Sequence, residues 1–118
     1  MRLPDESCIK SPRFHEFVLL FNRREFFAAH EVLEGMWLEK SGIEKDFLQG
    51  LIQIAASLVH VQRENPPGAA RVADNAMAYL AGFPDHVHGF PLGRLKIDLM
   101  HCLEHKNGFP EIIFPSPD

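Results

Sequence analysis

A histidine and a carboxylate stand four residues apart on a predicted helix, at His30 and Glu34. Residues at this spacing are neighbours on one helical face, so their side chains can contact each other or share a ligand. Phe26, Leu33 and Trp37 fall within the same arc of about 120° on a helical wheel, which predicts that this face points into the core. Burying a carboxylate without a partner is costly. We therefore expect Glu34 to be satisfied by a metal ion, by His30 or by donors from another helix.

The next predicted helix has a stripe of polar, uncharged side chains. Gln49, Gln53 and His60 lie within about 40° of one another on its wheel. No charged residue stands between Asp46 and Arg63, which predicts a central helix that is covered on most sides. Because Lys and Glu dominate ordinary solvent-facing surfaces, an uncharged polar stripe indicates a buried site. We predict that this stripe faces the histidine and carboxylate of the preceding helix.

Two imidazoles and one carboxylate suit a divalent metal ion such as Zn²⁺, with one coordination position left open for water. In this interpretation the ligands are His30, Glu34 and His60, and the site is hydrolase-like if it is catalytic. Glu31 or Gln53 then supports a ligand or acts as a base. The zinc-protease pattern HExxH is not matched, because Glu34 occupies the place of its second histidine.

The same side chains also suit a structural hydrogen-bond network without a ligand. Glu34 would then accept hydrogen bonds from His30, His60, Gln53 or Trp37, and such networks specify a unique packing. In this interpretation the chain is a non-catalytic helical module that forms a homo-oligomer. A third alternative is a metal-free pocket for a small polar ligand, with Trp37 as its wall. The sequence identifies neither a substrate nor a reaction, so whether the protein is an enzyme stays open.

A second pair of histidines, His101 and His105, also has a spacing that can bind metal, with Asp98 three residues before the first. On the wheel these residues fall beside Arg94 and away from the leucines of the same helix. We therefore predict a solvated face there and no site.

The stretch 22–37, NRREFFAAHEVLEGMW, resembles the bacterial and archaeal domain-of-unknown-function family 309. That family is marked by an HxxxExx[WY] motif, present here as His30, Glu34 and Trp37. The similarity continues through 47–60 (FLQGLIQIAASLVH) and 65–69 (NPPGA), and it extends over roughly residues 14–81. It implies a small all-α fold, roles for the three motif residues and metal binding at the motif. Gly35 and the proline-containing tail do not match the family pattern.

Apolar residues at helical spacing predict an all-α bundle of about five helices. Their expected ranges are 12–21, 25–40, 44–64, 66–81 and 92–106. We predict an N-terminal arm at 1–11, a single helical domain at 12–108 with a loop at 83–91, and an extended tail at 109–118. The stripe of Phe14, Phe17 and Phe21 is expected in the core, with a homodimer face as the alternative.

Composition excludes several classes of function. The chain of 118 residues has a formal charge of −4 without a basic segment, so neither nucleic acid nor an anionic membrane is an expected partner. No apolar run approaches the roughly 20 residues that span a bilayer, and the first residues have no secretion signal core. Cys8 and Cys102 are far apart and form no CxxC pair, which disfavours a disulfide framework. We expect a reduced, cytoplasmic protein.

Overall fold

The structure, a computed structural model, describes residues 2–106 and 108–114. In this part of the chain the helices are α1 (Glu6–Lys10), α2 (Pro12–Asn22), α3 (Phe26–Trp37), α4 (Gly42–Gln62), α5 (Pro66–Leu80) and α6 (Leu92–His105). A short antiparallel hairpin of β1 (His86–Val87) and β2 (Phe90–Pro91) precedes α6. The fold is mostly α-helical, which confirms the predicted class. Throughout the described ranges, each helix is too short or too polar to cross a bilayer.

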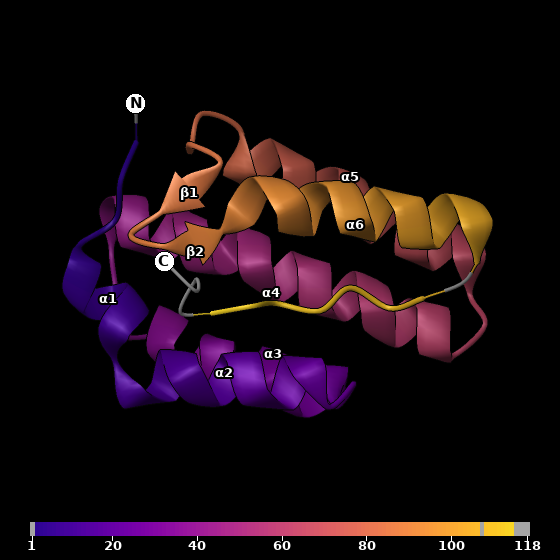
Figure 1. Ribbon diagram of the computed structural model, residues 1–118, viewed down its shortest axis with the longest axis horizontal. Helices are drawn as coiled ribbons and strands as arrows, with labels where there is room; N and C mark the ends of the chain where they lie inside the picture. The colour runs from indigo at the N-terminus through magenta and orange to yellow at the C-terminus, as the bar shows by residue number, and fades with distance from the viewer. Residues whose placement is uncertain (1, 107, 115–118) are drawn as a thin grey trace.

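The long helix α4 is the centre of the bundle. It packs against α3 and α5, and α2 packs against α3. Figure 1 shows α4 crossing the middle of the molecule, with α2 and α3 on one side and α5 and α6 on the other. The stripe of Phe14, Phe17 and Phe21 is fully buried within the one chain. It therefore belongs to the core and is not exposed as a dimer face.

Two short elements were not predicted. The segment expected to be an arm contains α1, whose Cys8 and Ile9 are buried, and Asp5 caps the helix by accepting a hydrogen bond from the Ser7 N–H. The expected loop contains the hairpin, where His88 and Gly89 form the turn with φ of 49° and 86°. Positive φ at both positions is the conformation of a two-residue hairpin turn. Elements this short are below the length at which periodicity can identify them.

The segment 108–114 runs between α2 and α6 (Figure 1). Its anchor is Ile112, which is buried and is bound by the side-chain amide of Asn22. Asn22 Nδ2 donates to the Ile112 carbonyl at 2.7 Å, and the Ile112 N–H donates to Asn22 Oδ1 at 2.7 Å. The remaining residues of the predicted tail, 115–118, lie outside the described part of the chain.

Both cysteines are free thiols buried in the core, with 1% exposure at Cys8 and 3% at Cys102. Burial raises the pKa of both thiols, because the thiolate is disfavoured away from water.

We expect a thiol reagent at neutral pH to label the native chain on the order of 100-fold more slowly than the urea-unfolded chain. Equal labelling rates would contradict this prediction.

The raised thiol pKa values also make the free energy of unfolding depend on pH. In the unfolded chain the thiols have their ordinary pKa of 9.0. The stabilisation that the neutral buried thiols contribute is therefore complete below that pH and is lost as the pH rises further.

Candidate functional site

His30 on α3 and His60 on α4 line the same shallow cavity, with a volume of about 150 Å³. We call this cavity the histidine pocket. Its lining residues come from α3, from the last turns of α4 and from the residue after α4: Phe27, His30, Ala56, Val59, His60 and Arg63. The structure thus brings two of the three predicted metal ligands to one cavity.

Glu34 does not lie in the histidine pocket. Its side chain is 52% exposed, and its Oε2 lies 3.4 Å from His30 Nε2. The prediction that this carboxylate is buried is therefore wrong. The wheel places Glu34 beside His30, but α3 remains open to water at Glu34. A carboxylate that remains in contact with water needs no buried partner.

His30 is largely buried. Its ring stacks on Phe27, with 5.6 Å between ring centroids, and its side chain is 20% exposed. Because a carboxylate only accepts hydrogen bonds, the 3.4 Å contact with Glu34 favours a proton on Nε2 of neutral His30. The other ring nitrogen, Nδ1, is buried and has no hydrogen-bond partner among the described residues. Such a buried polar atom requires an explanation.

The predicted supporting residues lie elsewhere. Glu31 is exposed, and the other three, Trp37, Gln49 and Gln53, are half-buried outside the histidine pocket. The Trp37 ring instead contacts the Lys45 ammonium group, with Nζ 3.9 Å from the ring centroid. Within residues 2–106 and 108–114, no side-chain hydrogen bond joins α3 to α4. The described side chains therefore do not form the network that was the alternative to a metal site.

Two small residues of α4 face α5. Ser57 Oγ donates a hydrogen bond to the Ala69 carbonyl at 2.8 Å, and Gly50 lies against the Leu80 side chain. The surface of α4 therefore has two neighbours: Gly50 and Ser57 contact α5, and Ala56 and His60 line the histidine pocket.

A side-chain amide determines which nitrogen of His60 is protonated. Asn65 caps α5 through Oδ1, which accepts from the Gly68 N–H at 3.3 Å. Its other amide atom, Nδ2, is a donor and lies 3.0 Å from His60 Nδ1. His60 Nδ1 is therefore the acceptor, and neutral His60 has its proton on Nε2.

Gly68 provides the space for this contact. A Cβ atom at this position would lie 2.4 Å from Asn65 Nδ2 and 2.8 Å from His60 Nδ1. Sequence reasoning did not select Asn65, Phe27 or Arg63 as site residues. The segment Asn65–Ala69 was part of the family resemblance, and that was the available signal for its importance.

No three His, Cys, Asp or Glu side chains in the described ranges are grouped so that they could hold a metal ion. The second pair, His101 and His105, is exposed, with 4.3 Å between ring centroids, which confirms the predicted solvated face. The neighbouring Asp98 is paired with Arg94 at 3.0 Å.

Comparison with known proteins places this chain in a family. The family model described as Domain of unknown function (DUF309) matches residues 14–72. An uncharacterised protein of Aquifex aeolicus (strain VF5) is 34% identical over 87 residues, which cover 73% of this chain and 26% of that protein. The uncharacterised protein YpuF of Bacillus subtilis (strain 168) is 33% identical over 102 residues, which cover 80% of this chain and 58% of YpuF. The chain thus spans about a quarter of the first relative and somewhat more than half of the second.

A solved structure is also similar. The crystal structure of the conserved hypothetical protein TTHA0068 from Thermus thermophilus matches with a TM-score of 0.71 and 31% identity. The match covers 79% of this chain and 97% of that chain, so the likeness includes nearly the whole of the solved protein.

Proposed function

We propose that this chain, which belongs to the DUF309 family, is a binding module whose histidine pocket takes a small oxyanion. The observation that supports this most is the hydrogen bond from Asn65 to His60 Nδ1. It makes the other ring nitrogen, Nε2, a hydrogen-bond donor in neutral His60. A donor suits a ligand oxygen that bears negative charge.

The other lining residues favour the same ligand. Arg63 supplies a permanently charged guanidinium group, and no carboxylate lines the histidine pocket. The unpartnered Nδ1 of His30 is an acceptor when the ring is neutral and Nε2 faces Glu34. We propose that the hydroxyl group of an oxyanion supplies the donor that this buried nitrogen lacks. Hydrogenphosphate combines both features, and the cavity of about 150 Å³ has room for an ion of that size.

A divalent metal ion held by His30, Glu34 and His60 is the rival proposal. The contact between His30 and Glu34, and the position of His60 at the same cavity, favour it. Histidine ligands of metals usually donate their second ring N–H to an acceptor. His60 has the opposite arrangement, because Asn65 offers its ring a donor. Metal binding through Nε2 would therefore require His60 to move its proton and lose the bond to Asn65.

The test measures binding of inorganic phosphate and of Zn²⁺ by calorimetry, with sulfate as the anion that lacks a hydroxyl group at neutral pH. We expect phosphate to bind more tightly than sulfate. Arg63→Gln should weaken phosphate binding at least about fivefold, because one charged hydrogen-bond donor is lost. Arg71→Gln is the matched control, since Arg71 is an exposed residue of α5 outside the histidine pocket.

The variant Asn65→Asp separates the two proposals. An aspartate keeps the helix cap, but it presents an acceptor to His60 Nδ1 and moves the proton of the ring to that nitrogen. We expect phosphate binding to fall and Zn²⁺ binding to rise in this variant. Tight Zn²⁺ binding by the unmodified chain, or phosphate binding that is insensitive to both Arg63→Gln and Asn65→Asp, would contradict the oxyanion proposal.

A further inference from the structure

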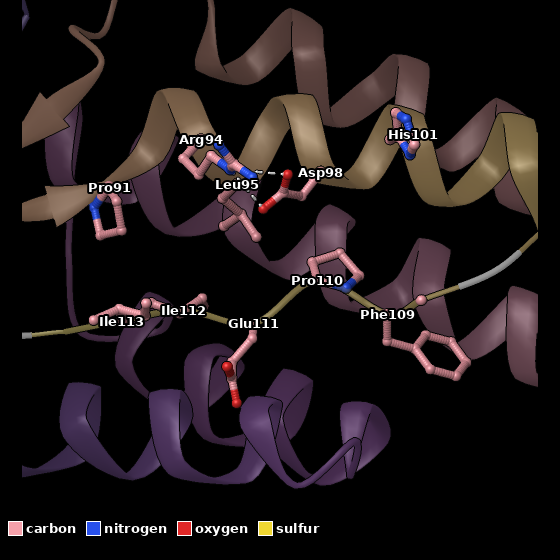
Figure 2. A pocket seen from close by; sticks show the side chains of 11 residues that line it. Pro91, Arg94, Leu95, Asp98, His101, Phe109, Pro110, Glu111, Ile112 and Ile113 are labelled. Carbon is pink, nitrogen blue, oxygen red and sulfur yellow. Dashed lines mark hydrogen bonds and ion pairs between the residues drawn. The ribbon is translucent and has the colours of Figure 1, made fainter.

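A groove of about 650 Å³ lies between α6 and the segment 108–113, and it shares no residue with the histidine pocket. Figure 2 shows Leu95 and Asp98 projecting from α6 toward this segment, while the Glu111 side chain points away toward α2. One wall of the groove is therefore α6 and the other is the segment 108–113. We call residues 111–113 of the second wall the tail edge.

The bonds of Asn22 determine the direction of the peptide groups at the tail edge. The Ile112 carbonyl and the Ile112 N–H both face Asn22 on α2. In a trans peptide unit the C=O and the N–H point in opposite directions. The N–H of Ile113 therefore points away from α2, and so does the C=O of Glu111. Because the tail edge lies between α2 and α6 (Figure 1) and the groove lies between this segment and α6, we infer that these two groups face the groove.

These two groups have no partner among the described residues: neither the Glu111 carbonyl nor the Ile113 N–H takes part in a hydrogen bond there. An acceptor at one residue and a donor two residues later, on the same side, are the groups that an edge strand offers to a parallel or an antiparallel neighbour. In its hydrogen-bonding pattern the tail edge therefore resembles the unpaired edge of a β-strand.

We propose that the groove binds an extended peptide segment of a partner protein by adding it to the tail edge as a neighbouring strand. Main-chain hydrogen bonds to Glu111 and Ile113 fix the position of the peptide along the tail edge, as in other cases of strand addition. The charges at the groove support recognition through the backbone, because Asp98 is paired with Arg94 and the two neutralise each other. The exposed side chain of Ile113 and the half-buried side chain of Pro91 offer apolar contact to an uncharged peptide.

The decisive variant is Ile113→Pro, which removes the N–H donor that the protein itself leaves unused. Proline also favours an extended residue before it, which is compatible with the bonded conformation of Ile112. The matched control is Ile113→Ala, which keeps the N–H and shortens the side chain. The fold of both variants is checked by thermal unfolding, since Ile113 is 62% exposed and neither change should alter the midpoint appreciably.

The probe is a peptide selected from a displayed library of linear sequences on the full chain, and its affinity is then measured by fluorescence polarisation. We expect it to bind the Ile113→Ala variant nearly as well as the unmodified chain and the Ile113→Pro variant at least about fivefold more weakly. Hydrogen exchange at the Ile113 amide should slow when the peptide is bound.

Three results would overturn the proposal. The selection could enrich no peptide. The selected peptide could bind Ile113→Pro as tightly as the unmodified chain, without slowing exchange at the Ile113 amide. Light scattering could show a dimer that the Ile113→Pro variant abolishes, in which case a second copy of this chain occupies the groove.

Discussion

Replacing Phe14 with alanine is expected to lower the free energy of unfolding by about 3–5 kcal/mol. Its ring is fully buried and contacts the rings of Phe17, Phe47, Phe90 and Phe114, at centroid distances of 5.5, 6.4, 5.2 and 5.8 Å. These partners belong to α2, α4, β2 and the segment 108–114. Removing one ring therefore leaves a cavity where four parts of the chain meet.

Urea denaturation followed by circular dichroism measures the effect. Leu19→Ala on the same helix is the control, because Leu19 is 50% exposed and its truncation should change stability by less than about 1 kcal/mol. A total stability of roughly 5–15 kcal/mol is usual for a domain, so the Phe14 variant should be close to unfolding at elevated temperature. A loss below about 1.5 kcal/mol would show that the cluster collapses around the missing ring.

Gly50→Ala and Gly35→Ala are expected to change stability in opposite directions. A Cβ atom at Gly50 would lie 2.4 Å from both Cγ and Cδ2 of Leu80, which is fully buried and cannot turn toward solvent. The helices α4 and α5 must then separate, at a cost of about 1–3 kcal/mol. At Gly35 the nearest atom, Arg13 Nη1, is 3.9 Å away. There alanine should stabilise the chain by about 0.5–1 kcal/mol through its better helix propensity.

A double-mutant cycle identifies the cause of the Gly50 effect. Leu80→Ala alone should cost about 2–5 kcal/mol, because it opens a cavity between α4 and α5. In the double variant the new methyl group at position 50 enters that cavity, so the total cost should be about 1 kcal/mol or more below the sum of the single costs. Additive costs, or a stabilising Gly50→Ala, would contradict the close approach of the two helices.

Local sequence signals predicted the main helices well. Ser11 caps α2 by accepting from the Phe14 N–H at 3.2 Å, and Asn65 caps α5, as the Ser-Pro and Asn-Pro-Pro patterns indicate. These caps depend on contacts within one turn, so the sequence alone contains the information. The short helix α1 and the hairpin escaped prediction, because one turn or two residues show no measurable period.

The candidate site was predictable only in part. The wheel placed His30 and His60 on inward faces, and the structure puts both at one cavity. It also placed Glu34 on the same inward arc, although this side chain is 52% exposed. A wheel gives the angle of a side chain around its own helix. It does not say how far the neighbouring helix extends across that face.

By itself the sequence determined the helical class, the positions of the long helices, the phenylalanine core and the two histidines of the cavity, because periodicity and caps act over a few residues. Only the tertiary structure decided the exposure of Glu34, the tautomer of His60 and the free backbone edge beside α6. The last of these depends on Asn22 meeting Ile112, which is 90 residues away in the chain. Local patterns do not encode the packing that brings such distant residues together, and the chemistry proposed here for the oxyanion and for the peptide depends on that packing.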